Sequence, residues 1–196
     1  MNQDLMNNAF YNAYANDFDK IPFADALIPL VSKYLPKSPC DILEIGSGAG
    51  ALALWLSKLG HQVICIEPAE KPAEKARKKG LNVALMRFQD FPVSQTFDAI
   101  MAISSLIHIS RAEMPSQIQK MSQLLKHDGI AFVSFIKGDS EGEEDPTDKG
   151  KKRFFSKFTQ DELNILLSPH FSLIETYKIE VKKMHQAFFL MALKPA

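Results

Sequence analysis

The chain has 196 residues, enough for one domain with a full hydrophobic core. Lysine plus arginine and aspartate plus glutamate number 23 each, so the formal net charge of zero gives no indication of a nucleic acid or an acidic membrane surface as a partner. The 2 cysteines suggest neither a disulfide framework nor a metal pair. The first residues lack the basic and apolar regions of a signal peptide, and no apolar run reaches membrane-spanning length, so we expect a cytoplasmic location.

A glycine-rich segment is the most informative part of the chain. Residues 41–45 form a short apolar run that carries Glu44, and residues 51–56 are again apolar. Three glycines stand between these runs at alternate positions: Gly46, Gly48 and Gly50. This order predicts a buried strand, a tight turn and the N-terminus of a helix, where bare backbone and free N–H groups can accommodate a ligand.

A second apolar run, residues 63–66, ends on Glu67. A carboxylate at the end of the second strand, about 20 residues after the glycines, is typical of ribose recognition in a doubly wound α/β fold. The pattern therefore predicts an adenosine-bearing cofactor. The glycines alone leave its kind open, because Gly46, Gly48 and Ala51 also satisfy the G-x-G-x-x-A pattern of dinucleotide folds.

Two features favour a cofactor other than a dinucleotide. Glu44 would oppose a pyrophosphate but could attract an ammonium group, and Gly50 is a glycine that the dinucleotide pattern does not require. Residues 43–50, Leu-Glu-Ile-Gly-Ser-Gly-Ala-Gly, closely resemble the first motif of class I S-adenosylmethionine (SAM)-dependent methyltransferases. The resemblance implies a Rossmann-like fold, SAM as the cofactor and methyl transfer as the activity.

Predicted strands and helices alternate along the first two thirds of the chain. The strands are expected at residues 41–45, 63–66, 81–86, 97–103 and 129–136, and the helices at residues 49–59, 69–79 and from 110 to about 126. Strands that alternate with helices of this length indicate βαβ units and a parallel sheet.

The C-terminal third breaks this alternation. Residues 137–152 are polar and charged and are predicted to form a mobile loop, before a short helix at 159–167 and two hairpin strands at 171–181 and 186–193. The resemblance, which spans about residues 11–193, implies one doubly wound, mostly parallel seven-stranded sheet of order 3-2-1-4-5-7-6 with a C-terminal antiparallel hairpin. We expect a single domain in three segments: a helical cofactor-closing segment at 1–37, a SAM-binding core at 38–136, and a lid loop, helix and hairpin at 137–196.

The resemblance also implies roles for side chains near the strand ends. Glu67 would accept the ribose hydroxyls, Glu44 would face the methionine moiety, and Asp90 beside Gln89 would receive the adenine amino group. Each has a plainer alternative, since strand-end carboxylates are often solvated and turns favour aspartate. The implied cofactor residues are Tyr11, Glu44, Gly46, Ser47, Gly48, Gly50, Glu67, Pro68, Gln89, Asp90, Ala102, Ile103 and Ser104.

The acceptor pocket is expected after the fourth strand. His108 could accept a proton from an acceptor hydroxyl or thiol, or it could simply hold the loop by a hydrogen bond. Arg153 is a possible anion contact from a lid over the pocket, in place of a nucleic-acid reading of the Lys-Lys-Arg-Phe-Phe run that precedes Ser156. The candidate acceptor residues are Tyr14, Ser105, His108 and Arg153.

Missing motifs narrow the chemistry. The fourth strand is followed by Ile103-Ser104-Ser105-Leu106 rather than Asn/Asp-Pro-Pro-Tyr, which argues against amino methyltransferases that act on nucleobase or glutamine nitrogen. The scattered histidines and cysteines suggest no metal site. We therefore expect methyl transfer to a small molecule. The alternatives that stay open are an NAD(P)-dependent oxidoreductase, an RNA or protein methyltransferase, and a non-catalytic SAM-binding module.

Overall fold

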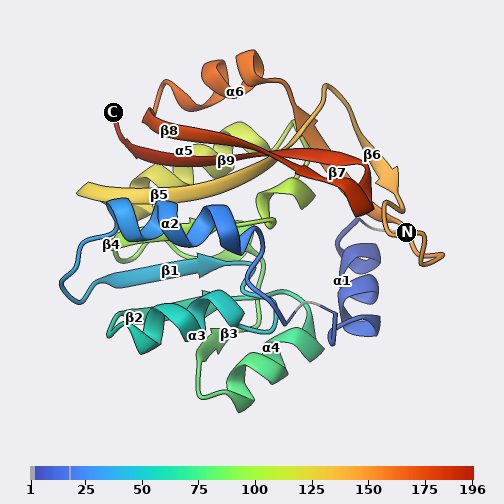
Figure 1. The fold of residues 1–196 in the computed structure, drawn as a ribbon, viewed down its shortest axis with the longest axis horizontal. Coiled ribbons are helices and arrows are strands. Elements are labelled where there is room, and N and C mark those ends of the chain that lie inside the picture. Colours follow the sequence, from blue (N-terminus) through green and yellow to red (C-terminus); the bar gives the residue numbers. More distant parts are fainter. Residues whose placement is uncertain (1–2, 18) are drawn as a thin grey trace.

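The computed structural model describes residues 3–17 and 19–196, apart from the side chain of Lys183. Residues 1, 2 and 18 of the expected segment 1–37 lie outside the described residues. A central sheet with helices on both faces forms the described part of the chain (Figure 1). Its parallel strands are β1 (Asp41–Ile45), β2 (Gln62–Ile66), β3 (Asn82–Ala84), β4 (Phe97–Ala102) and β5 (Leu125–Lys137).

The strand order reverses direction at β1. β1 pairs in parallel with β2 on one side and with β4 on the other, and β3 and β5 continue outward from these neighbours. Two connections therefore leave the carboxyl edge of β1 and β4 in opposite directions. In open α/β sheets this arrangement leaves a crevice between the loops, which is where ligands bind.

The C-terminal hairpin completes the sheet. β9 (Gln186–Pro195) runs antiparallel to β5 from the Ala131–Leu193 pair to the Ile136–Phe188 pair, and β8 (Phe171–Val181) pairs with β9. The main sheet is thus β3-β2-β1-β4-β5-β9-β8. The predicted order 3-2-1-4-5-7-6 is confirmed, because β8 and β9 are the strands expected as sixth and seventh.

The region predicted as a mobile loop contains further strands. β6 (Glu141–Glu144) pairs antiparallel with β7 (Arg153–Phe158), and β7 pairs briefly with the end of β5. The loop prediction for residues 137–152 is therefore wrong in part. Phe155 and Phe158 anchor β7 in the protein interior, and β6 forms on its edge with acidic side chains at the surface. The charged composition of this segment predicts a loop, but β6 forms a strand because its backbone pairs with the more apolar β7.

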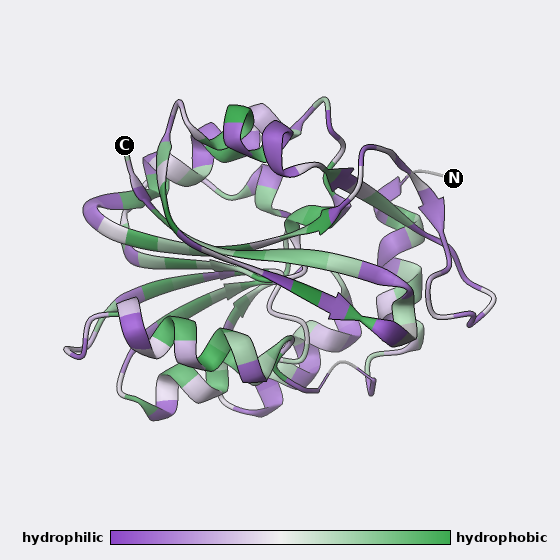
Figure 2. Cartoon of the chain, turned by 45° about the horizontal axis from the view of Figure 1, so that its top comes forward, coloured by the Kyte–Doolittle hydropathy of each residue, from purple (hydrophilic) through white to green (hydrophobic). Residues whose placement is uncertain are grey.

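Helices cover the two faces of the sheet. α2 (Ala24–Tyr34), α3 (Ala51–Lys58) and α4 (Glu70–Lys78) lie on one face, and α5 (Met114–Leu124) and α6 (Gln160–Leu167) lie on the other. Hydrophobic residues follow the sheet and the inward helix faces, as Figure 2 shows. In α5 the buried residues Met114, Ile118 and Met121 recur at helical spacing, so the helix turns one apolar stripe toward the sheet. Among the described helices, none combines the length and apolarity needed to span a bilayer.

Helix α1 (Gln3–Ala13) lies apart from both layers, beyond the carboxyl ends of the parallel strands (Figure 1). Its end is tied to α4, where Asn12 Oδ1 accepts a hydrogen bond from the backbone N–H of Lys71 at 2.8 Å. Its start is tied to the loop after β3 by an ion pair between Asp4 and Arg87 at 2.6 Å. α1 therefore closes over the edge where the strand order reverses.

Candidate functional site

The glycine turn joins β1 to α3, and its three glycines have different roles. All have positive φ, at 71° for Gly46, 55° for Gly48 and 79° for Gly50, a region that side chains disfavour. A Cβ on Gly46 would lie 2.5 Å from Ser105 Cβ, and one on Gly50 would lie 2.3 Å from Leu81 Cδ1. A Cβ on Gly48 would meet nothing within 4 Å. Gly46 and Gly50 thus permit close packing, whereas Gly48 faces open space.

Glu67 follows the last residue of β2 and holds this turn. Its side chain is buried, and its two oxygens accept hydrogen bonds from the backbone N–H groups of Gly48 and Ala69, each at 2.8 Å. Burial raises the pKa of Glu67 to about 6, while the two hydrogen bonds oppose that rise. Each carboxylate oxygen keeps a further lone pair, so the group can still accept hydrogen bonds from a ligand.

Glu44 lies on β1 and is only 5% exposed. Its Oε2 has no hydrogen-bond partner among the described residues. Burial raises the pKa of Glu44 to about 8, a hydrogen bond from the Ala53 backbone opposes the rise, and the nearby charge of Glu67 contributes to it. The group therefore carries a proton at neutral pH, and a cationic ligand beside it would favour its ionised form.

A cavity of about 360 Å³ opens over the carboxyl edge of the sheet and collects most of the predicted site residues. Predicted cofactor residues that line it are Tyr11, Glu44, Gly46, Ser47, Gly48, Glu67, Pro68, Gln89, Ile103 and Ser104. Predicted acceptor residues that line it are Ser105, His108 and Arg153. The cavity lining does not include Gly50, Asp90, Ala102 or Tyr14.

Asp90 and Tyr14 make other contacts instead. Asp90 is exposed and accepts two hydrogen bonds from Arg87, at 2.8 and 2.9 Å. The Tyr14 hydroxyl donates to the carbonyl oxygen of Lys149 at 3.1 Å, which joins α1 to the loop before β7. Among the residues expected near the adenine, the structure brings Gln89 to the cavity and leaves Asp90 outside it.

The end of β4 forms the wall opposite the glycine turn. Ser104 adopts a positive φ of 56°, an unusual conformation for a residue with a side chain. Its N–H donates to the hydroxyl of Ser134 on β5 at 2.8 Å, which holds the bend. Backbone strain of this kind is found where a function requires a particular geometry. The bend sets Ser105 against Gly46 and directs the following residues, η2 (Leu106–His108), along the cavity.

His108 is half-buried and takes part in a chain of hydrogen bonds. Its Nδ1 lies 2.7 Å from the carbonyl oxygen of Phe154, and because a carbonyl can only accept, Nδ1 carries the proton. Its Nε2 therefore accepts from the Tyr11 hydroxyl, also at 2.7 Å. The same hydroxyl lies 3.3 Å from Nη1 of Arg153, which donates to it. Burial lowers the pKa of His108 to about 4, and the charge of Arg153 adds to that effect.

These bonds connect three elements that are far apart in the sequence, α1, η2 and β7. Because both ring nitrogens of His108 are engaged and the ring stays neutral, the geometry favours the role of holding the loop over that of a base. Tyr11 and Arg153 are brought to the cavity by the same bonds. The sequence offered no signal for this arrangement, since its members are more than 40 residues apart.

Apolar residues that the sequence analysis did not select form much of the wall beyond His108. They include Phe23, Ile107, Phe155, Val181, Met184 and Phe188. Ile107, Phe155 and Phe188 pack together with Ile136 in one cluster. Two aromatic residues in the alternating pattern of β7 and β9 were the available signal, but alternation does not tell whether a side chain faces a core or a cavity.

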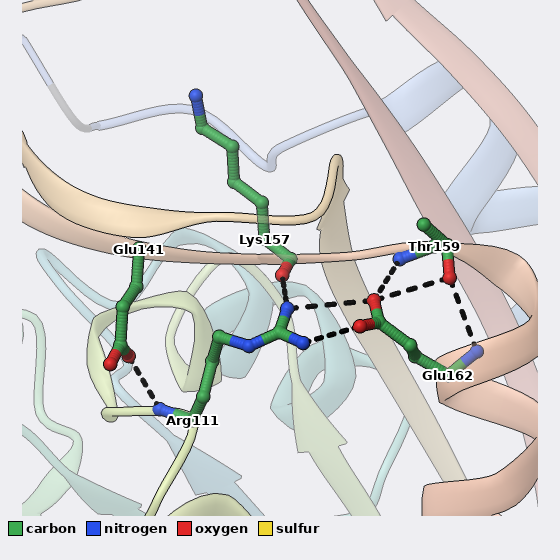
Figure 3. A network of polar contacts seen from close by, with 5 residues as sticks. All are labelled: Arg111, Glu141, Lys157, Thr159 and Glu162. Carbon is green, nitrogen blue, oxygen red and sulfur yellow. Dashed lines mark hydrogen bonds and ion pairs between the residues drawn. The ribbon is translucent and has the colours of Figure 1, made fainter.

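Arg111 ties β6, β7 and α6 together (Figure 3). Its backbone N–H donates to Glu141 at 2.7 Å, and its guanidinium donates to the carbonyl oxygen of Lys157 and forms an ion pair with Glu162. Glu162 also completes a capping box with Thr159 at the start of α6. The loop, the strand and the helix thus meet at one arginine that is paired with a carboxylate and a backbone carbonyl.

Known proteins share the fold and part of the sequence. A doubly wound sheet with a glycine turn and a strand-end glutamate is typical of nucleotide-binding α/β folds, and residues 42–129 match the methyltransferase domain family. An uncharacterized methyltransferase of Bacillus cytotoxicus is 32% identical over 129 residues, which cover 64% of this chain and 61% of the relative. The chain thus spans less than two thirds of that relative's length.

Solved structures show the same fold at low identity. The 1,6-didemethyltoxoflavin-N1-methyltransferase of Burkholderia thailandensis, with bound S-adenosylhomocysteine, has a TM-score of 0.75 at 19% identity and covers 96% of this chain and 87% of its own. The magnesium protoporphyrin IX methyltransferase of Synechocystis PCC 6803, with bound SAM, has a TM-score of 0.76 at 13% identity and covers 99% and 98%. Residues 42–129 are thus similar to a methyltransferase domain, and the chain has the fold of these two methyltransferases.

Proposed function

We propose that this protein binds SAM and transfers its methyl group to a small molecule. The observation that carries the proposal is the cavity at the carboxyl edge of the sheet, which reaches without interruption from the glycine turn to the apolar wall around Phe155. A module that only binds SAM needs the first part of this cavity, whereas a transferase also needs room for an acceptor. Two structural neighbours are methyltransferases named for small molecules, 1,6-didemethyltoxoflavin and magnesium protoporphyrin IX, and they favour an acceptor of that kind.

The residues of the first part fit the cofactor. Gly48 leaves open space near the N-terminus of α3. The buried Glu44 has an oxygen without a partner among the described residues, and the ammonium group of SAM would pair with it. Glu67 would accept the ribose hydroxyls while it keeps the turn in place. Gln89 and Pro68 would lie along the nucleoside, Ser47, Ile103 and Ser104 along the methionine moiety, and Tyr11 would close the site from α1.

Methyl transfer from SAM requires no covalent intermediate with the protein. The sulfonium of SAM supplies an already activated methyl group. The protein has to bind the acceptor in line with that group and keep water out, so orientation carries most of the rate enhancement. Ser104 and Ser105 lie at the boundary between the two parts of the cavity and would set this alignment. We further propose that segments 1–37, 38–136 and 137–196 act together as one domain, because residues of all three line the cavity.

Two measurements test the proposal. SAM or S-adenosylhomocysteine should raise the melting temperature, because a ligand that binds only the folded state stabilises it, and NAD or NADP should not. Tritiated SAM should then label a product in a small-molecule extract and leave fractionated RNA and protein unlabelled. A shift with NAD but none with SAM would contradict the proposed cofactor. Label that appears only in RNA or protein would contradict the proposed class of acceptor.

A further inference from the structure

Arg153, the first residue of β7, is a buried cation without a counter-ion among the described residues. It is 3% exposed, and it forms no ion pair with any described carboxylate. Of the two buried glutamates that line the cavity, Glu67 accepts from two backbone N–H groups, and Oε2 of Glu44 has no partner among the described residues. A buried charge left unpaired is costly, so such a residue usually has a ligand as its partner.

The free donors of Arg153 form one edge of the guanidinium. Nη1 donates to the Tyr11 hydroxyl, while Nε and Nη2 have no partner among the described residues. Nε and Nη2 carry parallel N–H bonds in a fixed fork, which matches the two oxygens of a carboxylate. The occupied donor holds the guanidinium in orientation, and the two unoccupied nitrogens are buried in a side chain that lines the cavity.

Aromatic rings fix the guanidinium further. Its central carbon lies 4.0 Å from the ring centre of Phe10 and 4.9 Å from that of Phe155. Such contacts stabilise the cation without using its N–H groups. Arg111 in Figure 3 is a useful contrast, because that arginine is paired with Glu162 and with a backbone carbonyl. Arg111 thus has a structural role, whereas Nε and Nη2 of Arg153 have no partner among the described residues.

Arg153 lies at the part of the cavity assigned to the acceptor. Phe155, which contacts the guanidinium, belongs to the apolar cluster with Ile107 and Phe188, and all three line the cavity. Most of the residues assigned to the cofactor lie on β1 or follow β1, β2 or β3, on the other side of β4. A ligand on Arg153 would thus have an anionic end against the guanidinium and an apolar body against these side chains.

We infer that the methyl acceptor is a carboxylate with an apolar body, and that Arg153 binds its carboxylate side-on through Nε and Nη2. That the ligand is the methyl acceptor rests on the proposed function. The anion site itself is inferred from the buried, unpartnered Nε and Nη2 of Arg153. It also explains why η2 and β7 are tied so firmly: His108 and Tyr11 hold the cation that recognises the acceptor.

The test uses matched pairs of probes on the protein loaded with S-adenosylhomocysteine. The pairs are 3-phenylpropionate with 3-phenylpropionamide and indole-3-acetate with indole-3-acetamide, which differ in charge but little in shape. By calorimetry, the wild-type protein should prefer the carboxylate of at least one pair by about tenfold or more. Arg153→Met should abolish the preference, and Arg153→Lys should retain part of it, because lysine keeps the charge without the fork. Lys152→Met is the control, since it removes an exposed cation one residue away.

Each result has one meaning. Equal binding of acid and amide in every pair, or a preference that survives in Arg153→Met, overturns the inference. A tenfold loss of S-adenosylhomocysteine affinity in Arg153→Met and Arg153→Lys also overturns it, because the fork would then hold the cofactor's own carboxylate. If the wild-type protein binds no S-adenosylhomocysteine, the proposed function fails, and the same probes on the unloaded protein still show whether the anion site exists. Circular dichroism of both variants verifies that they are folded.

Discussion

The two parts of the cavity are built in contrasting ways. The cofactor part is local, because the glycine turn, Glu67 and Gln89 come from consecutive strand and turn segments between residues 44 and 90. The acceptor part is assembled from distant segments, since His108 on η2 and Arg153 on β7 are joined through Tyr11 of α1. Local construction suits a ligand shared by many proteins, while distant segments can vary without disturbing the cofactor.

The charged groups of the two parts differ as well. In the cofactor part the burial of Glu44 and Glu67 raises their pKa, to about 8 and about 6. In the acceptor part burial lowers the pKa of His108 to about 4, while Arg153 has a free fork. The cofactor part thus has a neutral glutamic acid where a cationic ligand would sit, and the acceptor part has a cation where an anionic ligand would sit. Each part is electrostatically complete only with its ligand.

The largest effect is expected where the two parts meet, at Gly46. Gly46→Ala would bring a Cβ to 2.5 Å from Ser105 Cβ and would strain a residue at φ 71°. Overpacking and an unfavourable φ together should lower the free energy of unfolding by about 2–4 kcal/mol. Urea unfolding measures this loss.

Gly60→Ala is the matched control, because Gly60 also has positive φ, at 94°, but a Cβ added there would meet no atom within 4 Å. It should cost about 1 kcal/mol from backbone strain alone. Equal losses at the two glycines would mean that the contact between the turn and the end of β4 does not matter for stability.

The sequence predicted the cofactor part far better than the acceptor part, for a physical reason. Strand, turn and helix are specified by neighbouring residues, so the positions of Gly48 and Glu67 could be inferred from spacing. Asp90 shows the limit, because spacing alone does not tell that this carboxylate pairs with Arg87, three residues earlier, and stays out of the cavity lining. Arg153 was selected as an anion contact, but its burial and its bond to Tyr11 depend on chain segments that meet only in the fold.

The second prediction compares Glu67 with Asp90 in cofactor binding. Glu67→Ala should weaken SAM binding by about 1.5–3 kcal/mol, the usual effect of losing hydrogen bonds to a charged group. Asp90→Ala should change it by less than about threefold, because Asp90 does not line the cavity. Titration calorimetry on both variants checks this. If Asp90→Ala instead loses as much affinity as Glu67→Ala, the carboxylate reaches the adenine after all, as the sequence pattern implies.

The smallest effect concerns the proton on Glu44. At pH 7 a group with a pKa of about 8 is mostly protonated, and an ammonium group beside it would favour the carboxylate. SAM binding at pH 7 should therefore release a proton from Glu44, and affinity should rise severalfold between about pH 6 and pH 7, below the range in which an α-amino group titrates. The folding stability of the free protein changes with pH in the opposite direction to SAM affinity. A carboxyl with a raised pKa stabilises the fold below its unfolded value, about 4.3, and that stability is lost as the pH rises toward 8.

Glu44→Gln separates this effect from other sources of pH dependence. The amide is nearly the same size and does not titrate, so the variant should bind SAM without releasing a proton and should lose less stability between pH 5 and pH 8. Calorimetry in buffers of different ionisation enthalpy counts the protons directly. His108 should contribute nothing to the count, because it is already neutral above about pH 4. A wild-type protein that releases no proton would place the ammonium group away from Glu44 and would leave the buried carboxyl a structural feature of β1.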